Sequence, residues 1–240
     1  MGNGIFYFKQ FSVRHDKCAM KVGTDGVLLG AWCFSDDASQ VLDIGTGSGL
    51  IAIMIAQRNS KCNIDAVEID QESFNQASYN AANCKWSNRI NMHHASFSKF
   101  CNHNNHKYDL IVSNPPWFSN SLMNPDPVRA AARHSSSLSM NDLITGVQKL
   151  LSDTGRYCTI MPVPESDTFI KSAASAGLFC RIITKVKPNP DRPAKRYLME
   201  FQKISGETAI SEIIVELDKR HRYSDEYKNL TKDFYLQFRY

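Results

Sequence analysis

The sequence predicts an α/β fold: a mainly parallel sheet with helices on both faces and a C-terminal antiparallel hairpin. Short β-rich runs alternate with helical patterns along most of the chain. The run 108–113 is apolar almost throughout, as expected for a strand buried on both faces of a parallel sheet. Near the C-terminus, the strand-like runs 179–186 and 196–203 have no helix between them, which predicts the hairpin.

The other elements are expected in a regular order. Asp70 is placed to cap a helix, and 124–139 has no clear period and is expected to be a loop. A short strand at 213–217 and a helix at 225–235 should follow the hairpin. The remaining strands are expected at 40–44, 62–69, 89–94 and 155–162, and the remaining helices at 50–59, 71–84, 140–151 and 165–176.

Composition fits a single globular domain over residues 1–240, with an N-terminal segment 1–35 and a C-terminal extension 205–240. Apolar residues make up 42% of the chain and charged residues 22%, which is ordinary for a globular protein. The chain has no signal-peptide pattern and no apolar run long enough to span a bilayer, so no membrane association is expected. Its seven cysteines are irregularly spaced without a C-x-x-C pair, which favours the reducing cytoplasm.

The net charge of +4 is unevenly distributed. Residues 181–203 hold seven Lys or Arg against two acids, and residues 9–21 hold four against one. Such basic stretches suit a surface that binds phosphates. A merely solvated charged face explains them equally well.

A glycine-rich turn lies between the strand that contains Asp43 and the next helix. Gly45, Gly47 and Gly49 let the backbone approach a ligand closely, beside the unpaired N–H groups of a helix N-terminus. The G-x-G-x-G spacing differs from the dinucleotide pattern, and Asp43 would repel a pyrophosphate. The same acid suits the α-ammonium group of S-adenosylmethionine. The stretch resembles the first motif of class I methyltransferases, which implies their Rossmann-like fold and S-adenosylmethionine as the cofactor.

Three further residues are candidates for cofactor binding. Glu68 ends the second strand about twenty residues beyond the glycine turn, where an acid binds ribose hydroxyls. After the third strand, class I methyltransferases usually present an acid and then a hydrophobic residue to the adenine ring. Here Ser96 and Phe97 occupy these positions, so Ser96 departs from the usual pattern.

The fourth predicted strand runs into Asn114-Pro-Pro-Trp117, which resembles the N-P-P-[YFW] motif of methyltransferases that modify amino or amide nitrogens. The lone pair of such a nitrogen is delocalised and weakly nucleophilic. The Asn114 side-chain oxygen and the Pro115 carbonyl are placed to accept its hydrogens and localise that lone pair. Pro115 and Pro116 stiffen the turn, and Trp117 offers a face on which a planar substrate stacks.

Most of the chain is similar to the bacterial tRNA-Val adenine-N(6) methyltransferases. The likeness is carried by residues 6–32, 187–200 and 223–235. It implies methylation of the adenosine just 3′ of the anticodon, at position 37 of the tRNA. Lys21 and Thr24, around a turn expected at 23–26, are candidate cofactor contacts, and a purely structural turn is equally open. The candidate RNA-binding residues are Arg129, Arg133, Lys195 and Arg196.

Two other functions are open on these residues. One is N(5)-glutamine methylation of a protein, although that family usually carries a helical N-terminal domain that this sequence lacks. The other is an inactive RNA-binding relative, against which the intact Asn114-Pro-Pro-Trp117 turn argues. No metal is expected, because Cys101, His103 and His106 lie in an Asn-rich stretch, expected to be a loop, without a four-ligand pattern. The C-terminal aromatics are expected to pack, and no stable protein partner is implied.

Overall fold

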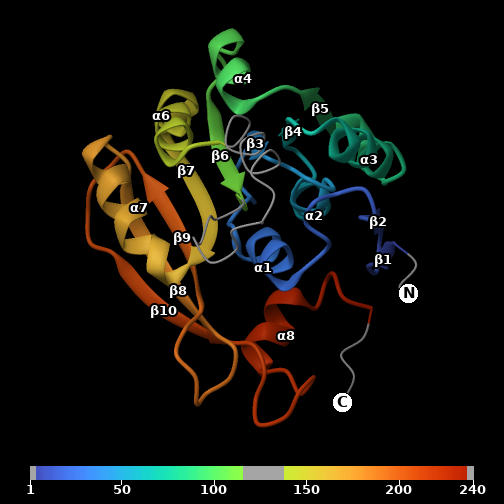
Figure 1. The fold of residues 1–240 in the computed structure, drawn as a ribbon, viewed down its shortest axis with the longest axis vertical. Helices are drawn as coiled ribbons and strands as arrows, with labels where there is room; N and C mark the ends of the chain where they lie inside the picture. Colours follow the sequence, from blue (N-terminus) through green and yellow to red (C-terminus); the bar gives the residue numbers. More distant parts are fainter. Residues whose placement is uncertain (1–3, 116–137, 237–240) are drawn as a thin grey trace, which may run out of the picture.

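The central feature of the fold is an eight-stranded sheet in a computed structural model that describes residues 4–115 and 138–236 (Figure 1). From one edge to the other, its strands are β10 (Ala209–Ile214), β8 (Phe179–Lys187), β9 (Arg196–Gln202), β7 (Leu151–Pro162), β6 (Tyr108–Ser113), β3 (Gln40–Ile44), β4 (Asn63–Glu68) and β5 (Ile90–His94). All neighbouring pairs are parallel except β7–β9 and β8–β9. The predicted parallel sheet and its antiparallel hairpin are therefore confirmed.

The side chains in the middle of β6 enter opposite cores in turn, which explains the apolar run Leu110–Val112. Leu110 and Val112 pack into one buried cluster, and Ile111 packs into the other. The first cluster lies under α1 (Thr24–Trp32), α2 (Leu50–Arg58), α3 (Gln71–Ala82) and α8 (Asp225–Thr231). The second lies under α4 (Phe97–His103), α6 (Met140–Leu150) and α7 (Val163–Ser175). Figure 1 shows the helices on both sides of the sheet.

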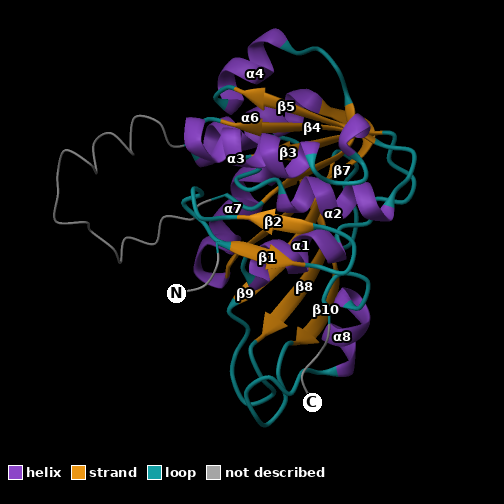
Figure 2. Ribbon diagram, turned by 90° about the vertical axis from the view of Figure 1, so that its right-hand side faces the viewer, coloured by secondary structure: helices purple, strands orange, loops and turns teal. Residues whose placement is uncertain are grey.

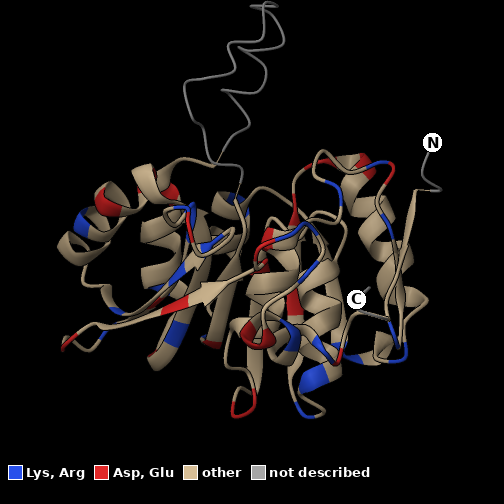
Figure 3. Cartoon of the chain, turned by 90° about the horizontal axis from the view of Figure 1, so that it is seen from below, with Lys and Arg blue, Asp and Glu red and all other residues tan. Residues whose placement is uncertain are grey.

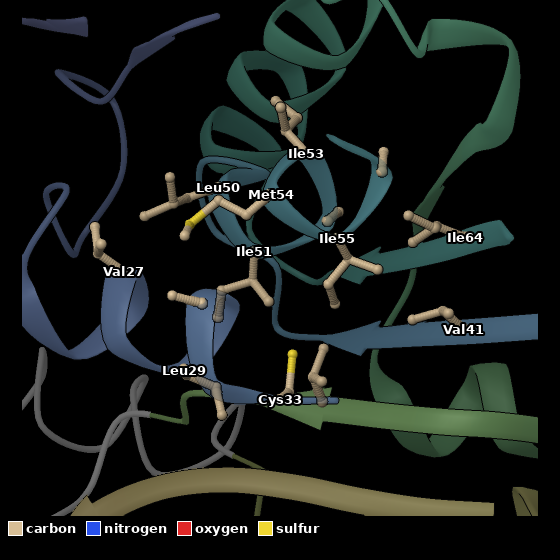
Figure 4. Close-up of a cluster of buried hydrophobic side chains, with 14 of the residues drawn as sticks. Val27, Leu29, Cys33, Val41, Leu50, Ile51, Ile53, Met54, Ile55 and Ile64 are labelled. Carbon is tan, nitrogen blue, oxygen red and sulfur yellow. The ribbon is translucent and has the colours of Figure 1, made fainter. Parts of the chain in front are cut away.

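Helix α1 replaces the turn expected at 23–26. Thr24, Asp25 and Gly26 form its first turn, so the prediction of a turn was wrong there. Its residues Val27 and Leu29 belong to the same buried cluster as Ile51 and Met54 of α2 (Figure 4). The two helices approach closely, because a Cβ atom at Gly30 would lie 2.8 Å from the Met54 sulfur.

An N-terminal hairpin of β1 (Ile5–Tyr7) and β2 (Ser12–Arg14) forms a second, small sheet (Figure 2). It is fixed to α3, where Asn80 Oδ1 accepts a hydrogen bond from the N–H of Arg14 at 3.0 Å. Its other neighbour is the C-terminal segment, where Phe8 pairs with Tyr235. The segments at the two ends of the chain are therefore packed together on the face that α1 and α2 cover.

Helix α4 and strand β10 differ from the sequence-based expectation. Cys101 and His103 lie on α4, so the loop expected around them was wrong. Strand β10 begins and ends earlier than the expected 213–217, and α8 ends at Thr231 rather than Tyr235. Among the described helices, none combines the length and the hydropathy required to cross a membrane.

Candidate active site

The glycine turn after β3 has the conformation that the sequence predicts. Gly45, Gly47 and Gly49 have φ angles of +66°, +57° and +79°, a region that side-chain-bearing residues rarely adopt. Gly49 directly precedes α2. A Cβ atom at Gly45 or Gly47 would meet nothing within 4 Å, so the turn borders open space. This space is available to a ligand that contacts the backbone.

Asp43 lies beneath this turn and holds it to α2. Its side chain is 1% exposed, and Oδ2 accepts hydrogen bonds from the Thr46 hydroxyl at 2.6 Å and the Ala52 N–H at 3.2 Å. Its other oxygen, Oδ1, is buried without a hydrogen-bond partner among the described residues. Burial raises the pKa of this carboxyl to about 7.

The raised pKa of Asp43 predicts a specific pH dependence of stability. Between an unfolded-state pKa of about 4 and the folded-state value of about 7, the folded protein keeps a proton that the unfolded chain has released. The free energy of unfolding should therefore fall as pH rises through this window, by up to about 4 kcal/mol. In Asp43→Asn, which does not titrate at this position, the fall should be smaller. Urea unfolding of both proteins at pH 5 and pH 8 measures the difference, and parallel pH dependences would contradict the prediction.

Glu68 joins the end of β4 to the glycine turn. Its Oε2 accepts from the Gly47 N–H at 2.9 Å, and Oε1 accepts from the N–H groups of Ile69 and Asp70 at 2.8 and 2.9 Å. Asp70 in turn caps α3 by accepting from the Ser73 N–H at 2.8 Å, as the sequence predicts. Ribose binding by Glu68 stays a prediction.

Ser96 and Phe97 have structural contacts of their own. Ser96 is the N-cap of α4, where its hydroxyl accepts from the Lys99 N–H at 3.2 Å. Phe97 is buried in the core beneath α6. Their contact with an adenine ring stays a prediction. Near Cys101, as elsewhere in the part of the chain that the structure describes, no three His, Cys, Asp or Glu residues gather in a way that fits a metal ion.

A cleft of about 1230 Å³ lies at the carboxyl edge of the parallel strands, where α/β sheets bind their ligands. Its lining also includes the start of α7, which the sequence did not indicate, through Val163, Pro164, Glu165 and Asp167. Asp43, Gly49, Glu68, Ser96 and Phe97 do not line it directly. The sequence-predicted site residues that it brings together are Lys21, Thr24, Gly45, Gly47, Asn114, Pro115, Lys195 and Arg196.

The end of β6 carries Asn114 and Pro115, the first two residues of the predicted catalytic turn, into this cleft. Ser113 is fully buried, and its hydroxyl lies 2.7 Å from the Tyr157 hydroxyl of β7, which fixes the last residue of the strand. Asn114 is half-buried and Pro115 is buried, and both line the same cleft as the glycine turn. Pro116, Trp117, Arg129 and Arg133 lie outside the described residues.

An ion pair crosses the cleft border between α1 and β9. Arg196 Nε lies 2.9 Å from Asp25 Oδ2, and both side chains are more than a third exposed. Figure 3 shows basic and acidic positions interspersed along the chain. A cation that forms an ion pair with a neighbouring acid therefore attracts an anionic ligand less strongly than an unpaired cation does. Asp25 therefore offsets the charge of Arg196, whereas the neighbouring Lys195 lines the cleft and forms no ion pair with a described residue.

A Rossmann-like methyltransferase is defined by three features together: the order of the strands in the sheet, the glycine turn after β3, and Asn114-Pro115 after β6. The family model of the methyltransferase small domain matches residues 23–161. A predicted O-methyltransferase from Agrobacterium tumefaciens has the same fold, with a TM-score of 0.67 and 19% identity over 88% of this chain and 96% of that one. A ribosomal protein L11 methylase from Lactobacillus delbrueckii subsp. bulgaricus matches with a TM-score of 0.52 and 19% identity over 74% of this chain and 76% of that one.

Full-length relatives specify the family. The chain is 47% identical to the tRNA1(Val) (adenine(37)-N6)-methyltransferase of Trichodesmium erythraeum, over 99% of this chain and 100% of that protein. It is 46% identical to the protein of the same name from Bacteroides fragilis, over 99% and 100%. The Yersinia enterocolitica protein of that name is 41% identical over 98% and 94%. The chain belongs to the tRNA1(Val) (adenine(37)-N6)-methyltransferase family.

Proposed function

We propose that this protein transfers a methyl group from S-adenosylmethionine to the exocyclic 6-amino group of adenine 37 in tRNA(Val). The single observation that carries the proposal is the meeting of the glycine turn and Asn114-Pro115 in one cleft. Family membership supports this choice of substrate, since the full-length relatives carry the corresponding name.

The residues around the glycine turn fit S-adenosylmethionine. The open space over Gly45 and Gly47 accommodates a ligand, and the unpartnered Asp43 Oδ1 offers an acceptor beneath the turn. Lys21, three residues before α1, and Thr24, its first residue, line the same cleft and suit the carboxylate end of the cofactor. When bound, the cofactor supplies an electrophilic methyl group on a sulfonium.

Asn114 and Pro115 act on the nucleophile. Their two oxygens would accept the hydrogens of the adenine amino group and direct its lone pair toward the methyl carbon. The nitrogen–methyl bond would form as the sulfur–methyl bond breaks, with S-adenosylhomocysteine as the leaving group, and the nitrogen would then lose one proton to solvent. Neither residue gives or takes a proton before the attack, so catalysis rests on alignment and on a fitted electrostatic pocket. Adenine in an anticodon loop is already largely unpaired, so turning it into this pocket costs little.

Lys195 should contribute one phosphate contact to tRNA binding. Replacing Lys195 with alanine is expected to weaken tRNA binding and to reduce the slope of log Kd against log salt by about 1, with little change in cofactor affinity. Filter binding at four salt concentrations measures this slope. Lys61→Ala is the matched control, because Lys61 is an exposed lysine just before β4, at the opposite edge of the sheet. Equal slope changes in both variants would contradict the assignment.

Methyl transfer from labelled S-adenosylmethionine to total bacterial tRNA, followed by nuclease digestion, tests the function. Label recovered as 6-methyladenosine would support the proposal, and sequencing of the labelled tRNA would locate it. Label found only in protein glutamine would replace tRNA with a protein as the substrate. Cofactor binding without label in any acceptor would support an inactive RNA-binding relative.

A further inference from the structure

A second hollow, of about 560 Å³, adjoins the cleft. Thr24, Asp25, Lys195 and Arg196 line both hollows, so the Asp25–Arg196 ion pair stands at their common border. The second hollow extends from this border between α1, the ends of β8 and β10, and α8. Figure 1 labels these four elements. Beyond this border, its lining has no role in the proposed methyl transfer.

Aromatic rings form much of the wall of this hollow, which we call the tyrosine pocket. They belong to Phe6, Tyr223, Tyr227 and Tyr235. Tyr227 is 3% exposed, as expected for a packing residue, and its ring stacks on that of Tyr223 with centroids 5.2 Å apart. Tyr223 itself is only half-buried and lines the pocket, while the buried Tyr227 ring holds its ring in place. Such a surface suits the stacking of a planar base.

The lining of the tyrosine pocket carries three cations and two acids, and Lys195 and Arg220 are the two cations that Asp25 does not offset. Lys195, Arg196 and Arg220 line it, against the acids Asp25 and Glu216. Asp25 is already paired with Arg196, and Glu216 Oε1 accepts the His221 N–H at 2.8 Å. A cationic rim over an aromatic wall is the combination that binds one nucleotide of a single strand, through its phosphate and its base.

We propose that the tyrosine pocket binds a nucleotide of the anticodon loop that flanks the target adenosine. The pocket shares its border with the catalytic cleft, so a strand whose target base enters the cleft passes Lys195 and reaches the pocket with its next bases. Tyr223 stacks on the flanking base and Arg220 contacts its phosphate. This inference rests on the proposed tRNA substrate and adds a second contact point on the same strand.

Two pairs of variants test the pocket. Arg220→Glu is compared with Lys219→Glu, which makes the same charge change at an exposed neighbour that does not line the pocket. Tyr223→Leu, which removes the aromatic face, is compared with Tyr223→Phe, which keeps it. We expect Arg220→Glu and Tyr223→Leu to weaken binding of the tRNA(Val) anticodon stem-loop about tenfold. The control variants Lys219→Glu and Tyr223→Phe should bind it within about twofold of the wild-type affinity. Fluorescence anisotropy at fixed salt measures binding, and thermal unfolding with S-adenosylmethionine affinity checks the fold.

Stem-loops with a single abasic nucleotide identify the occupant. An abasic nucleotide at one position beside the target should weaken binding to the wild-type protein about tenfold. The Tyr223→Leu variant should bind that abasic stem-loop as tightly as the wild type does, because the stacking contact is already absent. Equal losses from Arg220→Glu and Lys219→Glu would overturn the pocket in favour of a general electrostatic effect. Normal methylation and binding by both Arg220→Glu and Tyr223→Leu would overturn it as well and leave the proposed function standing. Absence of wild-type methylation of tRNA would instead remove the proposed function itself.

Discussion

Replacing Asn114 with alanine is expected to slow methyl transfer by about 10²–10³-fold, the loss typical of removing one preorganised polar contact to a reacting group. The side chain lies at the end of β6, one residue after the buried Ser113 that Tyr157 fixes. Without its oxygen, one amino hydrogen of the substrate has no acceptor and the lone pair stays delocalised into the adenine ring. Because the side chain is small and half-buried, the fold should remain intact.

Single-turnover assays with saturating tRNA measure this rate, and calorimetry measures cofactor affinity. Asn114 is also a candidate cofactor contact, and the two readouts separate the roles: a catalytic role lowers the rate with cofactor affinity nearly unchanged. Asn114→Asp is the matched variant, because its carboxylate keeps an acceptor oxygen and should retain more activity than alanine. Alanine and aspartate variants with equal residual rates would show that the acceptor is not what Asn114 contributes.

Replacing Gly47 with valine is expected to reduce S-adenosylmethionine binding by at least about 100-fold. Gly47 has φ +57° and lines the cleft, and a Cβ atom there projects into the open space in which the cofactor is proposed to lie. The added branched side chain occupies this space. The backbone conformation also costs a non-glycine residue about 1–2 kcal/mol, which should lower stability.

Gly177→Val separates these two effects. Gly177 follows α7 with φ +80°, and a Cβ atom there likewise meets nothing within 4 Å, but it does not line the cleft. Both variants should lose comparable stability in thermal unfolding, and only Gly47→Val should lose cofactor binding in calorimetry. Loss of binding in both variants would assign the effect to backbone strain instead of to the cleft.

The strands of the main sheet were predictable from the sequence because most are short β-rich runs bounded by turn residues. Helix α1 was not predictable. Strand β6 has the predicted bounds, since both its faces are buried and every turn signal lies outside it. In α1, six of nine residues, from Gly26 to Ala31, are buried, so the sequence lacks the amphipathic period that indicates a surface helix. Its two glycines further resemble a turn. The strands of the N-terminal hairpin have three residues each, too few to show a period.

The part of the site that belongs to continuous motifs was also predictable. Gly45, Gly47, Asn114 and Pro115 line one cleft because each follows a parallel strand at its carboxyl end. Contacts between distant segments were not predictable, since the Asp25–Arg196 pair joins positions 171 residues apart. The start of α7 lines the cleft through its place after β7, and its residue types carry no signal of their own.

Burial has a practical consequence for the seven cysteines, all of which are free thiols. Six are buried and Cys84 is half-buried, and desolvation raises the pKa of every one of them. The thiolate is the form of cysteine that attacks alkylating reagents, so the folded protein should react slowly at neutral pH. A cysteine introduced on the exposed loop at Lys219 would then take up a fluorophore selectively, without a cysteine-free background. Movement of that loop during RNA binding thereby becomes directly observable.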